Sequence, residues 1–144
     1  MPRPAAWRLS PDAYPIREQI QTRYQDLDTN GHLNNVAFAA LFETSRVRMN
    51  RALGMWDKVG GFRAVVARNE INYLAEGSFP DPVEIAVGIG RIGNRSWDML
   101  AAMLQNGQPI ATCDTVIVMT APAGEALPDA LRERLEGLQV KGER

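Results

Sequence analysis

The sequence predicts an α+β fold in which one long helix is wrapped by an antiparallel sheet of about five strands. Residues 35–53 contain no Gly or Pro, consist of good helix formers and are apolar on nearly every side at their start. One strand-like segment precedes this stretch and four follow it. A helix that is apolar all round must be covered, and the strand segments are what is available to cover it.

Length and charge restrict the classes of protein to which the chain can belong. A chain of 144 residues corresponds to one domain with a core of its own. The 16 Lys and Arg against 17 Asp and Glu leave a net charge of −1, with no basic run. This balance argues against a nucleic-acid partner and against an anionic membrane surface. No apolar stretch at the N-terminus is long enough for a signal peptide or a spanning helix, and the single Cys113 allows no disulfide within the chain. We therefore expect a cytoplasmic protein with no cofactor.

The first part of the chain is expected to lead into the helix through one strand. Residues 1–15 are rich in proline with little periodicity, which predicts an irregular lead-in to a single domain at residues 16–144. Residues 16–24 alternate between two faces, as is typical of a strand. Asn34 is a suitable N-cap for the helix and Gly54 a suitable end. A helix of this length spans about 30 Å and is expected to be enclosed rather than to lie on a surface.

The remainder of the chain is expected to form a meander of four strands. These strand segments are residues 62–74, 83–92, 96–105 and 109–120. Asn106-Gly107 is a strong hairpin signal, and residues 128–138 have the pattern of a short amphipathic helix. Because a single sheet covers only one side of the helix, we expect its outer face and edge strand to meet another subunit in a homodimer or homotetramer.

The stretch RYQDLDTNGHLNN, residues 23–35, permits two chemistries. Asp26, Asp28 and Asn30 occupy the first, third and fifth places of a calcium-binding helix-loop-helix. The twelfth place, which must supply a bidentate carboxylate, is Ala37. Such a loop is also entered from a helix, whereas the preceding residues alternate as a strand. We therefore expect no metal site here.

The same stretch resembles the active-site region of the hot-dog-fold acyl thioesterases. The pattern D-x-D-x-x-G followed by a long helix looks like the hydroxybenzoyl-CoA thioesterase family. The string DLDTNGHLNNVAF is also similar to the motif of the plant acyl-carrier-protein thioesterases, although Gly31 stands where that motif usually has Gln. The resemblance covers most of the chain, implies the hot-dog fold, and leaves open whether the acyl carrier is coenzyme A or a carrier protein.

Residue by residue, the resemblance implies a set of catalytic positions. It places the catalytic carboxylate at Asp28, and the plant-type active-site Asn and His at Asn30 and His32. Asn35 corresponds to the residue whose backbone N–H polarises the thioester carbonyl. Glu76 loosely matches a Glu that the plant enzymes use after the helix.

The resemblance also suggests binding residues. The turn at residues 91–96, with Arg95 and Ser96, resembles the family's basic segment that meets coenzyme A phosphates. Phe38 and Phe42 on the helix are candidates for the lining of an acyl tunnel. Ordinary structural roles are the alternatives: a surface charge for Arg95, and burial alone for the two phenylalanines.

Physical chemistry supports the same site independently. A helix N-terminus offers unpaired N–H groups and a positive dipole end, which suit the oxyanion of thioester hydrolysis. Hydrogen bonds from Asn30 or His32 would keep Asp28 ionised. An ionised carboxylate can act as a general base on water or attack the acyl carbon as a nucleophile.

Other interpretations of these residues remain. Asp28 and Asn34 can simply cap the loop and helix, and His32 and Glu76 can be structural or solvated. A hot-dog hydratase or dehydratase would also use Asp28 and His32. A non-catalytic module that only binds acyl thioesters would keep the pocket, although it has no need of a carboxylate beside the carbonyl.

Overall fold

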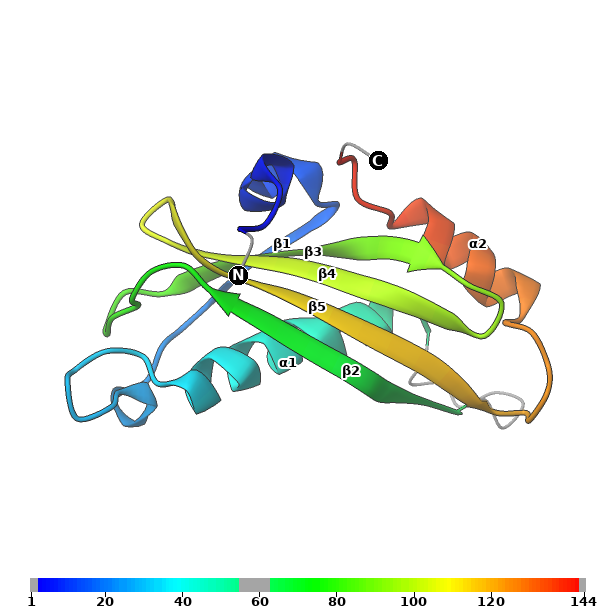
Figure 1. The fold of residues 1–144 in the computed structure, drawn as a ribbon, viewed down its shortest axis with the longest axis horizontal. Helices are drawn as coiled ribbons and strands as arrows, with labels where there is room; N and C mark the ends of the chain where they lie inside the picture. Colours follow the sequence, from blue (N-terminus) through cyan, green and yellow to red (C-terminus); the bar gives the residue numbers. More distant parts are fainter. Residues whose placement is uncertain (1–2, 55–62, 143–144) are drawn as a thin grey trace.

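The computed structural model describes residues 3–54 and 63–142. In chain order the elements are η1 (Ala6–Leu9), η2 (Pro11–Ala13), β1 (Ile16–Ile20), η3 (Tyr24–Asp26), α1 (Asn35–Ala52), β2 (Arg63–Tyr73), β3 (Val83–Ile92), β4 (Ser96–Gln105), β5 (Gln108–Ala121) and α2 (Asp129–Gly137). The expected long helix and five-stranded antiparallel sheet are confirmed (Figure 1). Phe62, expected at the start of β2, lies outside the described residues. No described helix is long and apolar enough to cross a membrane.

The strand order differs from the expected meander. The sheet runs β1-β3-β4-β5-β2, so only β3, β4 and β5 are consecutive neighbours, and β2 pairs with β5 at the opposite edge from β1. The expectation that β2 and β3 are neighbours was wrong. Short turns force neighbouring strands to pair, as Asn106-Gly107 does with φ values of 52° and 79°. Residues 74–82 are long enough to carry the chain across the end of the sheet, and periodicity alone cannot show that crossing.

Helix α1 lies along the inner face of the sheet, against β1, β3 and β4. Its start is fixed by Asn34, whose Oδ1 accepts the N–H of Ala37 at 2.7 Å, and Gly54 follows its end with φ of 77°. The side chains that it buries are Ala37, Phe38, Leu41, Phe42, Ser45 and Met49. Val36 in the first turn is 71% exposed. The helix is therefore covered on one side only in this chain, because one sheet covers one side.

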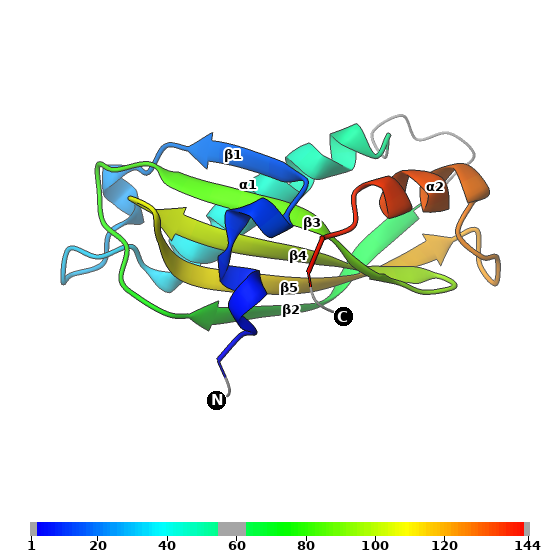
Figure 2. The same cartoon turned by 90° about the horizontal axis from the view of Figure 1, so that it is seen from above.

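The outer face of the sheet carries both ends of the chain. Figure 2 shows the N-terminal and C-terminal segments crossing one face of the sheet while α1 lies on the other. The buried Arg8 forms an ion pair with Asp114 at 2.6 Å and donates to the Tyr14 hydroxyl at 2.9 Å. The Lys141 N–H donates to the Ala13 carbonyl at 2.8 Å, which joins the two ends. Two 3-10 turns, η1 and η2, thus pack on the sheet within residues 3–15. Part of the face expected to meet another subunit is therefore covered by the chain itself.

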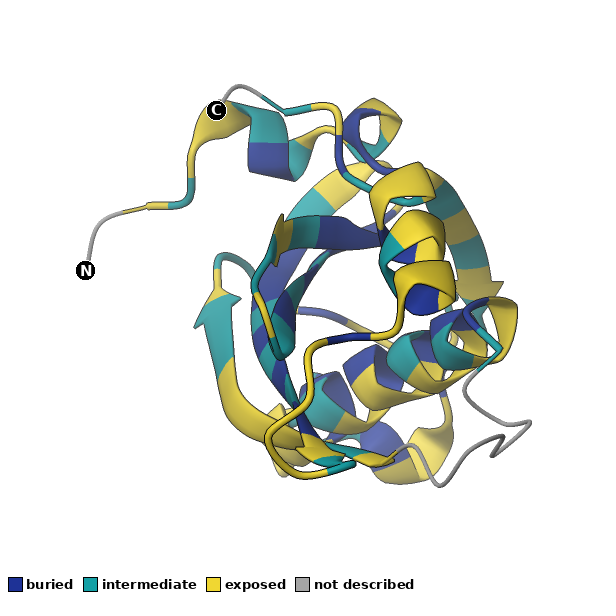
Figure 3. Ribbon diagram, turned by 90° about the vertical axis from the view of Figure 1, so that its right-hand side faces the viewer, coloured by how far each residue is buried: buried dark blue, intermediate teal, exposed yellow. Residues whose placement is uncertain are grey.

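Strand β1 is shorter than its alternation suggests. The expected period of two holds over Ile16–Ile20, and the chain then leaves the sheet, with η3 in place of continued strand to residue 24. The hydroxyl of Thr22 donates to the Asp81 carbonyl at 2.9 Å, and the Gln21 amide donates to the Pro80 carbonyl at 2.8 Å. These side-chain bonds attach the chain after β1 to the connection between β2 and β3. Figure 3 shows that buried residues concentrate in the middle of the sheet and on the side of α1 that faces it.

Candidate active site

The loop between β1 and α1 is folded around the Asp28 carboxylate. The Asp28 N–H donates to the His32 carbonyl at 2.8 Å, and Gly31 takes the positive φ of 79° that this turn requires. Asp28 Oδ1 accepts the backbone N–H of Asn30 at 2.8 Å and of His32 at 3.1 Å. The hydrogen bond from His32 and then that from Asn30 lower the pKa of Asp28 below its ordinary value. The side chain is exposed, so the loop presents an ionised carboxylate at neutral pH.

The loop is attached to the connection between β2 and β3, and this brings His32 to Glu76. The Leu33 N–H donates to the Gly77 carbonyl at 2.9 Å. One residue away on each side, His32 Nε2 lies 3.0 Å from Glu76 Oε2, with the two side chains 39% and 73% exposed. The structure therefore places Glu76 beside His32, although its sequence match was loose. Because His32 lies in the same loop as Asp28, the pair of His32 and Glu76 forms the second polar element of the candidate site.

The tip of α1 offers backbone donors. The Ala37 N–H is capped by the Asn34 side chain, and the Phe38 N–H donates to the Asn34 carbonyl at 3.1 Å. Among the described residues, no hydrogen bond engages the N–H groups of Asn35 and Val36, both of which are exposed residues. None joins the Asp28 carboxylate to this tip either. The two N–H groups are available to an acceptor from outside the chain.

Aromatic side chains lie around this loop. Phe38 is buried and meets Tyr73 edge to face, with ring centroids 5.2 Å apart. Tyr24 meets Phe79 in the same way at 6.1 Å. The sequence-based prediction included Phe38 but missed both tyrosines, which are 77% exposed at position 24 and 53% exposed at position 73. Tyr73 ends β2 and Tyr24 begins η3 directly before the polar loop, and a tyrosine beside a polar loop was the signal available for both.

A cleft opens beside the carboxylate. Its volume is about 500 Å³, and the residues that line it are Tyr24, Gln25, Leu27, Asp28, Thr29 and Gly31. The lining combines the aromatic ring of Tyr24 and the side chain of Leu27 with the ionised Asp28 and the polar Gln25 and Thr29. Such a mixed surface can contact both polar and apolar parts of a ligand.

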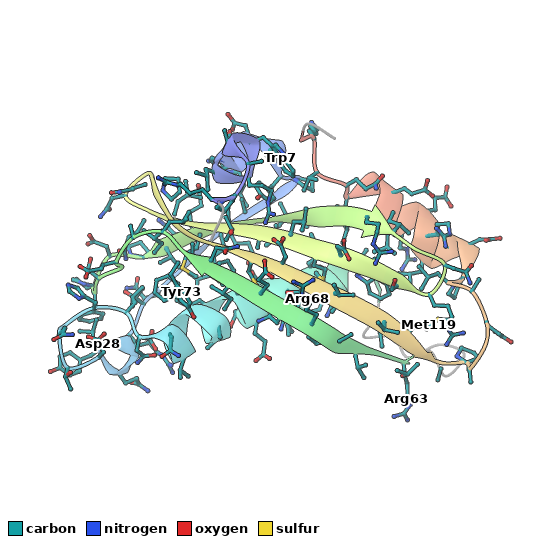
Figure 4. The ribbon with its side chains drawn as sticks, viewed as in Figure 1. Trp7, Asp28, Arg63, Arg68, Tyr73 and Met119 are labelled. Carbon is teal, nitrogen blue, oxygen red and sulfur yellow. The ribbon has the colours of Figure 1, made fainter. Side chains whose placement is uncertain are left out.

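Arg95 and Ser96 lie at the other end of the sheet. Arg95 donates to the carbonyl of Glu125 and, at 3.0 Å, to that of Met119, while the Ser96 hydroxyl lies 3.1 Å from an Arg91 nitrogen. Figure 4 shows Met119 and Asp28 at opposite ends of the molecule. The structure does not bring this turn to Asp28 within one chain.

Asp26, the first residue of the calcium pattern, has a structural role. Its Oδ1 accepts from the Arg23 guanidinium at 2.8 Å and its Oδ2 from the Arg23 backbone N–H at 2.9 Å. Both oxygens are therefore occupied, and the side chain is buried. In residues 3–54 and 63–142, no group of three or more His, Cys, Asp and Glu side chains is arranged to hold a metal ion.

Comparison with known proteins assigns the class. A sequence profile described as the thioesterase-like superfamily matches residues 22–135, and the chain belongs to this family. The match contains the loop, α1 and the whole sheet from β2 to β5. No curated protein sequence matches the chain.

Solved structures share the hot-dog fold with this chain. The PA5185 protein from Pseudomonas aeruginosa is 29% identical with a TM-score of 0.79, covering 91% of this chain and 96% of its own. A thioesterase from Thermus thermophilus complexed with coenzyme A and Zn is 32% identical with a TM-score of 0.78, covering 92% and 98%. A predicted thioesterase from Bacillus stearothermophilus is 27% identical with a TM-score of 0.79, covering 88% and 98%.

The expected family and fold are confirmed by these comparisons. They do not single out the hydroxybenzoyl-CoA branch. Thioester hydrolysis is the general chemistry that the family membership supports.

Proposed function

We propose that this protein hydrolyses an acyl-CoA thioester to the free acid and coenzyme A. The observation that carries the proposal is the loop at Asp28, where an exposed and ionised carboxylate precedes a helix tip with two unengaged N–H groups. The carboxylate supplies the base or nucleophile that hydrolysis needs, and the N–H groups supply an oxyanion site. Coenzyme A is favoured over a carrier protein because the relative from Thermus thermophilus is described as complexed with coenzyme A.

Two routes use the same residues. In the first, Asp28 takes a proton from water as the water oxygen attacks the thioester carbon, and the carbonyl oxygen becomes an oxyanion that the Asn35 and Val36 N–H groups stabilise. Collapse of this intermediate breaks the carbon–sulfur bond and releases the thiolate. In the second, Asp28 attacks the carbon itself, the thiolate leaves, and water hydrolyses the resulting mixed anhydride.

His32 and Glu76 have a supporting role in both routes. When Nε2 of His32 carries a proton, it donates a hydrogen bond to Glu76 Oε2, 3.0 Å away. Nδ1 is then free to accept a hydrogen bond from water or, if it also carries a proton, to donate to the leaving thiolate. Because Nε2 of His32 meets Glu76, this geometry favours hydrolysis over a hydratase reaction that pairs the histidine with Asp28. Asn30 contributes through its backbone N–H, which holds the Asp28 carboxylate.

The complete site is proposed to form in a homodimer, joined through β2. This strand is at the edge of the sheet, and Val65 and Val66 on it are 52% and 47% exposed. A long edge strand with exposed apolar side chains is a template for pairing with another chain. Pairing two copies here would extend the sheet and pair the free backbone groups of β2. It would also allow Arg95 and Ser96 of one copy to serve the Asp28 site of the other.

The test is release of free thiol from a panel of short, medium, long and aromatic acyl-CoA substrates. Asp28→Asn is expected to lower kcat/KM by at least about a thousandfold while the fold and the oligomer persist. Asp81→Asn, the same change at a carboxylate of the neighbouring connection, is the matched control and is expected to be active. Full activity in Asp28→Asn would place the catalytic carboxylate elsewhere, and a monomer in sedimentation at micromolar concentration would contradict the dimer.

Kinetics distinguish a catalytic role of His32 and Glu76 from a role in substrate positioning. His32→Ala and Glu76→Gln are each expected to lower kcat with little change in KM if the pair acts on the water or the leaving group. An increase in KM alone would make them substrate-positioning residues instead.

A further inference from the structure

The inner face of the sheet is incompletely covered on the side of β2. Helix α1 packs against β1, β3 and β4, whereas on β2 the inward-facing Val66 and Tyr73 remain 47% and 53% exposed. Tyr73 lies at the end of β2 nearest to Asp28 (Figure 4). Its ring packs against that of Phe38. The inner face of β2 is therefore partly uncovered from Tyr73, beside the candidate site, to Val66, and we call this the uncovered strip between α1 and β2.

A polar cluster interrupts the apolar inner face along this strip. The Thr115 hydroxyl donates to Asn69 Oδ1 at 2.7 Å, and the Cys113 thiol donates to the same oxygen at 3.1 Å. From the helix, Arg46 Nη1 approaches the Thr115 hydroxyl oxygen at 3.4 Å. Thr115 and Cys113 are each 2% exposed, whereas Asn69 on the edge strand is exposed, so the cluster joins the interior to the uncovered part of β2.

Arg46 is poorly paired for a charge in this position. Its side chain is 12% exposed, and in the described part of the chain its polar contacts are the long bond to Thr115 and Glu43 at 3.8 Å. Glu43 is itself 68% exposed, so water weakens its attraction to the guanidinium. A largely buried guanidinium with five donors is costly unless an anion satisfies it. One turn further along the helix, Asn50 Oδ1 is buried without a partner among the described residues.

The cluster lies at a defined distance from the aromatic pair beside the candidate site. Along α1, Arg46 is about 12 Å from Phe38 at the helical rise per residue. Along β2, Asn69 is about 13 Å from Tyr73 at the strand rise. The two paths agree, so an extended group that lies along β2 from Tyr73 would reach the guanidinium after about 12–13 Å.

We propose that Arg46, with Asn69 and Thr115 beside it, forms a distal subsite that binds a carboxylate at the far end of the acyl group. The preferred substrates would then be thioesters of dicarboxylic acids, with one acid joined to sulfur and the other paired with Arg46. A planar guanidinium matches a carboxylate better than it matches any other common acyl substituent. This subsite rests on the proposed function, because it takes the acyl group to lie between α1 and β2 with its thioester at Asp28.

Binding of non-hydrolysable ligands tests the subsite separately from catalysis. The probes are thioethers of coenzyme A that carry either an ω-carboxyalkyl chain or the matching alkyl chain, over lengths from four to about ten carbons, measured by calorimetry. At the best length the carboxylated ligand is expected to bind about ten- to a hundredfold more tightly, as expected for a hydrogen bond to a charged group. Arg46→Met should remove this preference, and Arg46→Lys should retain part of it.

Arg48→Met is the matched control, because Arg48 is on the same helix but pairs with Glu18 at 2.5 Å on the β1 side. It should leave the preference unchanged. Equal binding of the two ligand types at every length, or a preference that survives Arg46→Met, would overturn the subsite. If Arg46→Met instead dissociates the oligomer and the wild type shows no preference, the guanidinium pairs with a carboxylate of a second copy. Retained preference with no hydrolysis of any thioester would refute the proposed function and leave the subsite standing.

Discussion

Replacing Gly77 with alanine tests whether contact with the connection between β2 and β3 holds the active-site loop in place. A Cβ on Gly77 would lie 2.6 Å from Leu33 Cδ1 and 3.2 Å from Ile110 Cδ1. Leu33 is 5% exposed, and its N–H is hydrogen-bonded to the Gly77 carbonyl, so side chain and backbone are both constrained. The new methyl group must therefore displace Leu33, which lies directly between His32 and the helix cap Asn34.

The expected loss of stability follows from two opposing terms. Overpacking of a buried site costs about 1–3 kcal/mol, while the lower entropy of the unfolded chain after Gly→Ala returns about 0.4–1 kcal/mol. The net effect is a loss of about 1–2 kcal/mol in the free energy of unfolding, which lowers Tm by a few degrees in a chain of this size. Because a small displacement of a positioned group is expensive in catalysis, kcat/KM is expected to fall on the order of tenfold or more.

Urea unfolding and thiol release from an acyl-CoA substrate measure the two effects. Gly137→Ala is the control, since a Cβ there meets no atom within 4 Å and Gly137 lies in α2. This variant is expected to be as stable as the parent or slightly more so, with unchanged activity. If Gly77→Ala matched Gly137→Ala in both assays, the loop would not depend on this contact.

Three further outcomes are expected. Asn34→Ala should lose about 1 kcal/mol in chemical unfolding because the Ala37 N–H loses its cap, whereas Asn34→Asp should lose little. Because the folded-state pKa of Asp28 is lowered, its ionised form persists as the pH falls, and the acid limb of kcat/KM should lie below the ordinary range of an aspartate; a limb within that range would contradict the loop hydrogen bonds. Arg8→Met should destabilise the fold by about 1–2 kcal/mol and speed proteolysis of the N-terminal segment, since Asp114 loses its partner; equal digestion rates would show that the segment is not held by this pair.

Local sequence patterns predicted the helices and strands but not which strands pair with each other. The cap at Asn34 and the hairpin at Asn106-Gly107 depend on a few adjacent residues, and both were predicted correctly. The position of β2 at the far edge depends on pairing with β5, and a period of two does not encode a strand's partner. The early end of β1 depends on bonds from Thr22 and Gln21 to residues almost sixty positions away.

The candidate site likewise contains residues that the local sequence predicts and residues whose position depends on distant contacts. Asp28, Asn30 and His32 lie within one short loop, so their spacing was visible in the sequence and the structure joins them through backbone hydrogen bonds. Glu76 reaches His32 only because the Leu33 N–H holds two loops together, a contact for which the sequence offers no spacing rule. Arg95 fits a family pattern, but within one chain the structure holds it against the carbonyls of Glu125 and Met119, away from Asp28, and a local pattern does not encode that separation.

The exposure of Asp28 in a single chain bears on how the site works. In bulk water an ionised carboxylate is well solvated, and electrostatic help from the helix tip is weak, because both act most strongly where water is excluded. The loop hydrogen bonds already fix the carboxylate. What a single chain lacks is protein that shields this carboxylate from water. In the proposed dimer, a second copy paired with the exposed edge of β2 would exclude water from this end of the sheet without rearranging the loop. If the proposed dimer forms, one chain can carry an exposed carboxylate and two N–H groups that no described residue engages, since water satisfies them until the partner and the thioester bind.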